Sequence, residues 1–378
     1  MNGRSCAGER LHASSDTAKR AVQTPTARAV LVGVVLLALW AAASVLARTA
    51  HHQRVDRAAG AMAAGTTAVG AGRGTEAVGL FRDAVALDPQ RPEYRLALGK
   101  ALVVVGRLGE AEPYVYEVLR QTPVDGESNL VLARILARQG NPTEAESAYY
   151  RAIYGRWPAV AQPLRRQARL ELIALYRRQG ATSRLRAALL ELSSAFPGDR
   201  ELQLQAGRDL LAAGFAADAA RQLRLIDERF SDPGRAPVLL ARAEFARRHY
   251  VEAYAAAGRA LARLPDDAEA AGIRALSARV LSLDPDQPRL SPARRAARVR
   301  TLLTDVHGRL VACGSPEAPE EARLLAAIGR WLSRRTSDVE VGRGLLQAAA
   351  AQWKTTCPAA PDTDAAARVL TDLATELP

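Results

Sequence analysis

Apolar residues recur at three- and four-residue spacings along most of this chain. In stretches such as 96–106 and 110–120 they form a stripe along one side of a helix. Glycine stands at the expected helix ends, and Asp-Pro or Thr-Pro separates successive helix pairs. Such a stripe needs more than one neighbour to cover it, so the pattern predicts an all-α protein in which short helices stack in series.

Residues 29–47 differ from this pattern because they are uniformly apolar. They contain no charge and lie between Arg28 and Arg48. At the rise of an α-helix they span about 28 Å, close to the hydrocarbon thickness of a bilayer. We therefore predict one transmembrane helix over 29–47. The alternative is a signal peptide cleaved after Ala47, which would release a secreted protein. The long preceding segment and the length of the apolar run favour the uncleaved anchor.

Basic residues on the two sides of the apolar segment indicate its orientation. Five precede the segment within the basic tail 1–28, and three follow it in the expected linker 48–57. They are Arg4, Arg10, Lys19, Arg20 and Arg28 before it, and Arg48, Arg54 and Arg57 after it. This small excess predicts a cytoplasmic N-terminus. We expect a single-pass protein of the inner membrane whose soluble region is periplasmic.

A fixed period of 34 residues runs through the helical part of the chain. Gly72, Gly106 and Gly140 are each 34 residues apart, and after six extra residues the register resumes with Gly180 and Gly214. Small residues repeat at the eighth place of each unit, at Gly65, Gly99, Ala133, Gly207 and Ala241. Prolines near the end of each unit are Pro89, Pro123, Pro197 and Pro265. A period of this length indicates a solenoid of stacked helix pairs.

These positions resemble the tetratricopeptide-repeat signature, in which each repeat is two antiparallel helices. The resemblance covers 58–267, as six repeats at 58–91, 92–125, 126–159, 166–199, 200–233 and 234–267. Ile173 departs from the small eighth position in the fourth repeat, and Trp157 stands at the proline place of the third. Residues 268–378 are expected to be a helical cap or a separate small helical domain, with helices near 268–283, 292–311, 317–335, 338–354 and 363–376.

Composition argues against several other classes of protein. The net charge of +12 could suggest nucleic-acid binding. However, the basic residues are spread along the chain without a patch interleaved with aromatics, and no nucleic-acid module is recognisable. The glycine run 70–74 lacks the preceding strand of a phosphate loop, so we interpret it as a helix connector. His51, His52, His249 and His307 lack partners in a catalytic or metal motif. We therefore expect no catalytic residue, cofactor or metal.

The three cysteines are too few for a disulfide framework. Cys6 precedes the apolar segment, whereas Cys313 and Cys357 follow it, so a membrane would separate them. If the soluble region lies outside the cytoplasm, Cys313 and Cys357 can form a disulfide across a predicted helical hairpin. Two free thiols are the alternative.

The resemblance also predicts a partner-binding groove. In this family, positions two, five, nine, twelve and thirteen of each first helix face the concave side. Basic residues at positions nine, twelve and thirteen are Lys100, Arg134, Arg138, Arg177, Arg178, Arg208 and Arg242, and apolar residues at position five are Leu96, Leu130, Leu170, Leu204 and Val238. We expect this surface to accept a protein segment with acidic and apolar side chains. The alternative is a solvated face in an arginine-rich protein.

Two functions remain consistent with these features. The first is a membrane-anchored scaffold that binds proteins or peptides. The second is a structural subunit of a machine for export, polysaccharide assembly or pilus assembly. The fold class alone does not decide between them.

Overall fold

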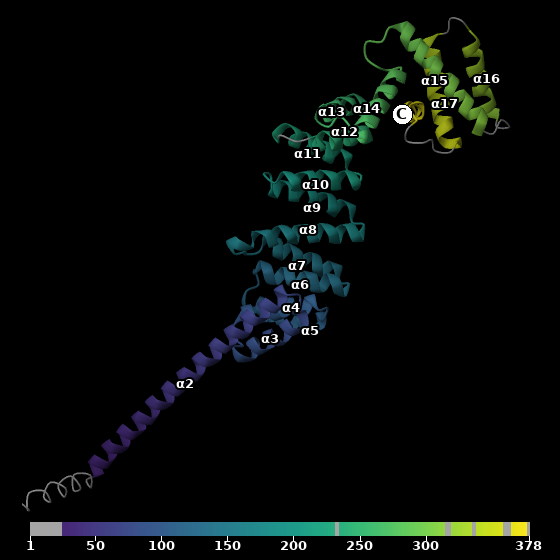
Figure 1. The fold of residues 1–378 in the computed structure, drawn as a ribbon. Helices are drawn as coiled ribbons and strands as arrows, with labels where there is room; N and C mark the ends of the chain where they lie inside the picture. The colour runs from purple at the N-terminus through teal and green to yellow at the C-terminus, as the bar shows by residue number, and fades with distance from the viewer. Residues whose placement is uncertain (1–24, 231–233, 314–318, 335–337, 358–363, 376–378) are drawn as a thin grey trace, which may run out of the picture. The chain divides into compact units, whose positions relative to one another are not determined.

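The computed structural model describes residues 25–230, 234–313, 319–334, 338–357 and 364–375 (Figure 1). Its regular elements over these ranges are helices joined by short turns, so the predicted all-α class is confirmed. Most of the basic tail expected over 1–28 lies outside the described residues.

The helices follow one another in tandem. Their bounds are α2 (Pro25–Gly70), α3 (Gly74–Leu87), α4 (Pro92–Val104), α5 (Leu108–Gln121), α6 (Gly126–Gln139), α7 (Pro142–Tyr154), a short 3-10 turn η1 (Ala159–Ala161), α8 (Gln162–Gln179), α9 (Thr182–Ala195), α10 (Arg200–Ala212), α11 (Ala216–Arg229), α12 (Arg235–Ala246), α13 (Tyr250–Arg263), α14 (Ala268–Leu283), α15 (Pro292–Cys313), α16 (Pro319–Ser333), α17 (Val339–Thr356) and α18 (Ala365–Thr375). The chain forms two compact units, one up to Leu175 and one from Tyr176 onward.

In the first unit, α2 joins the apolar segment to the first repeat without a break (Figure 1). Its apolar part is long enough to cross a membrane, and none of that part is buried against other residues of the chain. Residues 48–57, expected to be a linker, are helical and lie inside α2. Ala58 and Ala68 are buried near its C-terminal end, where α2 packs against α3. One helix therefore includes the candidate anchor, the connecting segment and the first helix of the first repeat.

The repeating glycines end the first helix of each pair. Their φ angles are positive: 73° at Gly72, 79° at Gly106, 83° at Gly140, 63° at Gly180 and 85° at Gly214. Glycine adopts this left-handed conformation without a steric penalty, which explains the residue type at this place. In the sixth repeat Arg248 occupies the same place with φ 64°. Its Nη1 pairs with Oδ1 of Asp372 in α18 at 2.5 Å.

Small residues at the eighth place allow the two helices of a repeat to approach closely. A Cβ atom on Gly65 would lie 2.5 Å from the ring of Phe81. The equivalent distances are 2.9 Å from Gly99 to Val115 and 2.8 Å from Gly207 to Leu223. Since real Cβ atoms do not tolerate such distances, these three crossings require glycine or a shift of the partner.

The end of the third repeat, ahead of the extra residues, folds back onto the turn between the second and third repeats. The Arg156 amide donates to the Val124 carbonyl at 2.7 Å, and the Gly126 amide donates to the Arg156 carbonyl at 2.9 Å. Trp157 donates from Nε1 to the Ala152 carbonyl at 2.7 Å, and its ring fills the space beside Gly126. Trp157 thus replaces the usual proline with a packed side chain.

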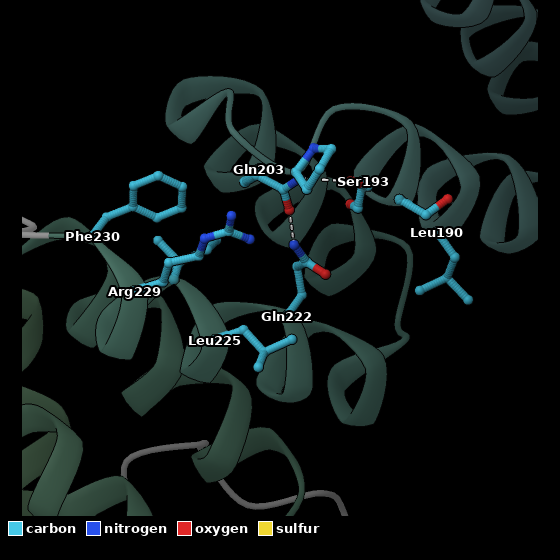
Figure 2. Close-up of a pocket in the computed structure, with 10 residues that line it drawn as sticks. Leu190, Ser193, Gln203, Gln222, Leu225, Arg229 and Phe230 are labelled. Carbon is cyan, nitrogen blue, oxygen red and sulfur yellow. Dashed lines mark hydrogen bonds between the residues drawn. The ribbon is translucent and has the colours of Figure 1, made fainter.

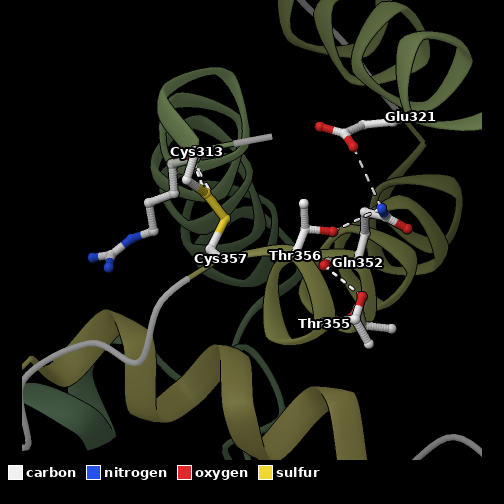
Figure 3. Close-up of a disulfide and its surroundings, with 8 residues drawn as sticks. Cys313, Glu321, Gln352, Thr355, Thr356 and Cys357 are labelled. Carbon is white, nitrogen blue, oxygen red and sulfur yellow. Dashed lines mark hydrogen bonds between the residues drawn. A yellow bond between two sulfur atoms is a disulfide. The ribbon is translucent and has the colours of Figure 1, made fainter. Parts of the chain in front are cut away.

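The C-terminal helices of the second unit share a core with the sixth helix pair and α14. Tyr250 of α13 and Val280 of α14 belong to the same buried cluster as residues of α15–α18. Cys313 at the end of α15 and Cys357 after α17 form a disulfide, with Cα atoms 5.4 Å apart (Figure 3). It closes the hairpin formed by α16 and α17.

Candidate partner-binding site

The predicted basic residues of the first helices are largely engaged in contacts between repeats. The Nζ atom of Lys100 in α4 lies 2.6 Å from Oε1 of Glu127 in α6. Arg177 in α8 pairs with Asp209 in α10 at 3.1 Å. Arg242 in α12 pairs with the following helix α14 through Glu269, at 2.5 Å. In each pair a base in one first helix meets an acid in the next first helix.

Arg134 makes the most extensive contact of this kind. Its Nε and Nη2 donate to the Glu171 carboxylate at 2.9 and 2.8 Å, and the Tyr149 hydroxyl donates to the same carboxylate at 3.2 Å. Burial alone would lower the pKa of Arg134, but the hydrogen bonds and charge of Glu171 outweigh it and raise that pKa. Arg134 is therefore a structural cation that joins the third and fourth repeats.

Arg138 is also occupied, since its Nη1 donates to the Val103 carbonyl at the end of α4 over 2.7 Å. Guanidinium groups commonly satisfy the last carbonyls of helices. Lys100, Arg134, Arg138, Arg177 and Arg242 therefore each have a partner within the chain. Neighbouring first helices pack closely enough for long basic side chains to reach across to the next repeat.

The expected apolar floor is also only partly available. Leu130 and Leu204 are each 1% exposed and belong to the core between helices. Leu96 and Leu170 are half-buried. Val238 is 7% exposed but lines a pocket, so it contributes to a surface that a partner could reach.

That pocket lies in the second unit, between the first helices of the fifth and sixth repeats and α14. It has a volume of ≈ 310 Å³. Its lining residues are Arg208, Arg235, Val238, Leu239, Arg242, Leu264, Asp267 and Glu269. Three predicted groove residues, Arg208, Val238 and Arg242, therefore meet at one place.

This pocket carries three arginines against two acids, Asp267 and Glu269, and the repeat register explains the excess. In the second repeat Lys100 stands at position nine, and it pairs with Glu127 at position two of the third repeat. In the sixth repeat Arg242 stands at position nine, and it pairs with Glu269 at the equivalent place in α14. At the junction between the fifth and sixth repeats, position nine is Arg208 and position two is Arg235. Both side chains are exposed and line the pocket, and neither has an ion pair among the described residues.

The chemistry of this pocket suits a carboxylate beside an apolar group. Two guanidinium groups offer several donors in planar arrays, which match carboxylate geometry. Val238, Leu239 and Leu264 supply apolar surface in the same pocket. Arg178, the remaining predicted groove residue, is exposed. It does not line this pocket.

Sequence reasoning did not select Arg235, although the signal was present. Position two was among the places expected to face a partner, and acidic residues fill it at Glu93, Glu127 and Glu201. Arg235 reverses that charge in the sixth repeat. A comparison of position two with position nine of the preceding repeat would have identified this junction.

Comparisons with known proteins agree with the fold. Residues 62–126 and 96–161 match the family model described as tetratricopeptide repeat. No curated protein matches the chain. Tetratricopeptide repeats mediate protein-protein interactions and are typically non-catalytic scaffolds.

Solved structures of similar fold have low sequence identity. The structure titled as the functional characterisation of Pseudomonas aeruginosa pilF is 14% identical, over 59% of this chain and 99% of that chain, with a TM-score of 0.39. YrrB, titled a TPR protein with an unusual peptide-binding site, is 16% identical over 50% of this chain and 95% of its own, with a TM-score of 0.37. The structure of Naa15/Naa10 bound to HypK-THB is 16% identical over 84% of this chain and 50% of that one, with a TM-score of 0.46. The family match over 62–161 and the tandem helix pairs together show that this chain carries tetratricopeptide repeats, and its N-terminal apolar helix is a candidate membrane anchor.

Proposed function

We propose that this protein is a membrane-anchored scaffold that binds an acidic segment of a partner protein at the pocket between its fifth and sixth repeats. The observation that carries the proposal is the pair Arg208 and Arg235, which stands where two other junctions, those of Lys100 and Arg242, place a base opposite an acid. A carboxylate of the partner would take the place of the missing acid.

The anchor is supported by the surroundings of the apolar segment. Arg48, Arg54 and Arg57 follow it directly on α2, and all three are exposed. None of them has a hydrogen bond or ion pair with a described residue, in contrast to the paired cations of the repeats. Free cations next to an apolar helix suit the phosphate layer of a membrane. The proposed location is the inner membrane, with the repeats in the periplasm.

One substitution separates binding from stability at the proposed site. Arg235→Glu would recreate the base–acid pair found between Arg242 and Glu269, so the repeats should remain folded with an unchanged or higher melting temperature. The same change removes the free cationic pair, so partner capture from solubilised membranes should be lost. A variant with the same charge change, Arg156→Glu in the segment before α8, serves as the control. Its capture should equal that of the wild type.

Unchanged capture by the Arg235→Glu protein would contradict the proposed site. The composition of the captured material also separates the two functions. Exchangeable ligands that acidic peptides displace would indicate an adaptor, whereas one salt-resistant complex of fixed stoichiometry would indicate a brace in an export, polysaccharide or pilus machine.

A further inference from the structure

A second pocket lies between the fourth and fifth repeats. It has a volume of ≈ 250 Å³ and is formed by α9, α10 and α11 (Figure 2). Its lining residues are Leu190, Ser193, Ser194, Pro197, Gln203, Gln222, Leu225, Ile226, Arg229 and Phe230. None of them lines the pocket that contains Arg208 and Arg235, so the two sites are chemically independent.

Leu225 distinguishes the fifth repeat from the other five. It occupies position 26, and its side chain is 60% exposed at the pocket. The other repeats carry a charged residue at this position: Asp83, Glu117, Arg151, Glu191 and Arg259. An exposed leucine where a charge is otherwise tolerated is not needed for folding, and it provides apolar surface that a partner can cover.

A pair of amides, the buried Gln203 and the half-buried Gln222, forms the polar wall of the same pocket. Gln203 is 4% exposed, and its Nε2 donates to the carbonyls of Ser193 and Phe196 at 2.6 and 2.8 Å. Gln222 donates from Nε2 to the Gln203 Oε1, as Figure 2 shows. These bonds fix the orientation of the Gln222 amide, so its Oε1 remains as an acceptor at the pocket, with no donor among the described residues.

Gln222 stands at position 23 of the fifth repeat, a place where the other repeats have no amide side chain. The equivalent residues of the other repeats are Leu80, Tyr114, Ala148, Ala188 and Ala256. The fifth repeat therefore exchanges an apolar or aromatic residue for an amide at position 23 and a charge for a leucine at position 26. These two exchanges lie side by side in one pocket.

The edge of the pocket carries a cation. The Arg229 guanidinium lies 5.8 Å from the centre of the Phe230 ring, and the Arg229 side chain is exposed. The pocket therefore combines an apolar floor, one hydrogen-bond acceptor and one positive charge. Its volume is below the range usual for complete small-molecule ligands, and it suits a single large side chain.

We propose that this pocket is a second docking site, which binds a segment of a partner protein through one large aliphatic or aromatic side chain. That side chain packs against Leu225 and Phe230, an adjacent backbone N–H donates to Gln222 Oε1, and a nearby carboxylate pairs with Arg229. A buried apolar anchor of this kind supplies most of the binding energy of many interfaces.

The test uses full-length protein in detergent micelles and defined peptides. The peptides are fluorescein-labelled Gly-Ser sequences of about twelve residues with Leu, Phe or Ser at the centre and Asp two residues later. Fluorescence polarisation should show that the Leu and Phe peptides bind about tenfold more tightly than the Ser peptide, the effect expected of one anchoring side chain. Leu225→Arg, which installs the residue type of position 26 in the third and sixth repeats, should abolish this preference.

Two control variants make the result specific. Gln222→Ala, which matches three other repeats, should weaken the Leu and Phe peptides while leaving the melting temperature close to that of the wild type. Val251→Arg changes another exposed apolar residue, in α13, and should leave the preference intact.

Three results would overturn the proposal. Equal binding of the Leu, Phe and Ser peptides would show that the pocket does not select an apolar side chain. Loss of the preference in Arg235→Glu but not in Leu225→Arg would assign the peptides to the first-helix pocket. Conversion of a dimer to a monomer by Leu225→Arg, measured by sedimentation, would show that a second copy of the chain covers Leu225.

Discussion

Arg134 and Glu171 are joined by two parallel hydrogen bonds that link the first helix of the third repeat to that of the fourth. Each side chain is only about a quarter exposed. A partly buried pair of this geometry is costly to break from one side, because the remaining charge loses its partner. The contact therefore belongs to the structure of the array, although position nine was expected to face a binding partner.

Removing this pair should destabilise the protein. Among the described residues, Arg134→Ala leaves the Glu171 carboxylate with the Tyr149 hydroxyl and the Gln167 amide as side-chain donors, and we expect a loss of about 2 kcal/mol in the free energy of unfolding. Arg178→Ala, at an exposed position of α8, should change it by less than about 0.5 kcal/mol. Urea unfolding followed by circular dichroism compares the two. Equal effects would contradict the structural role of Arg134.

Gly140, at a helix end, and Gly258, at an uncrowded place inside a helix, should respond in opposite ways to alanine. Gly140 has φ 83°, so Gly140→Ala should cost about 1–2 kcal/mol. Gly258 lies inside α13 with open space around its Cα, so Gly258→Ala should stabilise the protein by about 0.5–1 kcal/mol. Thermal unfolding of the two variants tests the assignment of the helix ends. A destabilised Gly258→Ala protein would contradict the helix placement.

The sequence predicted the helix pairs because periodic small residues, glycines and prolines have local physical effects. Gly65, Gly99 and Gly207 are needed where helices cross, and Gly140 is needed where a helix ends. The partners of charged side chains could not be predicted in this way. The arginine content suggested a solvated face, whereas Arg138, Arg165 and Arg298 donate to carbonyls at the ends of helices.

The pocket proposed as the binding site was predicted only in part, for the same reason. Arg208, Val238 and Arg242 do meet at a pocket, but Leu204 is buried and Arg242 is paired. Whether a cation at position nine is free to bind a partner depends on the residue at position two of the next repeat. The sequence pattern of one repeat taken alone does not include that neighbour. The continuity of α2 through 48–57 was missed because charged residues there resemble a linker, although none of them breaks a helix.

The disulfide provides a test of the compartment. If the repeats are periplasmic, the mass of the non-reduced protein should be lower by two hydrogens, and Cys313→Ser with Cys357→Ser should lower stability by about 2–4 kcal/mol. Cys6→Ser should have no such effect, because Cys6 is expected on the other side of the membrane. Complete alkylation of both Cys313 and Cys357 without reductant would contradict a periplasmic location.

Stability should depend on pH in opposite directions at two aspartates. Burial raises the pKa of Asp372 above its ordinary 3.8, despite the nearby Arg248. The stability that Asp372 contributes is therefore complete below 3.8 and is lost as the pH rises through the higher folded-state pKa. Hydrogen bonding from Arg186 lowers the pKa of Asp218, whose contribution is present above 3.8 and is lost as the pH falls through the lower folded-state pKa.

The corresponding amide variants make these signs measurable. The melting temperature of Asp372→Asn minus that of the wild type should be higher at pH 7.5 than at pH 4. The variant removes a charge that burial disfavours, and that charge is present in the wild type at pH 7.5. Asp218→Asn should instead lose more stability relative to the wild type at pH 7.5 than at about pH 2.5, below the ordinary pKa of 3.8, since it removes a charge that Arg186 stabilises. Melting temperatures at each pair of pH values provide the comparison, and the same sign for both variants would contradict the assignment.

Binding of a protein partner at the junction of Arg208 and Arg235 can be tested by photo-cross-linking in intact cells with benzoylphenylalanine at Leu239, which lines that pocket, followed by mass spectrometry of the washed membrane fraction. We expect a discrete adduct on a chain that retains residues 29–47, and its loss when Arg235→Glu is added. An adduct that persists in Arg235→Glu would contradict the proposed site, and a mature chain that begins at Arg48 in the soluble fraction would contradict the proposed anchor.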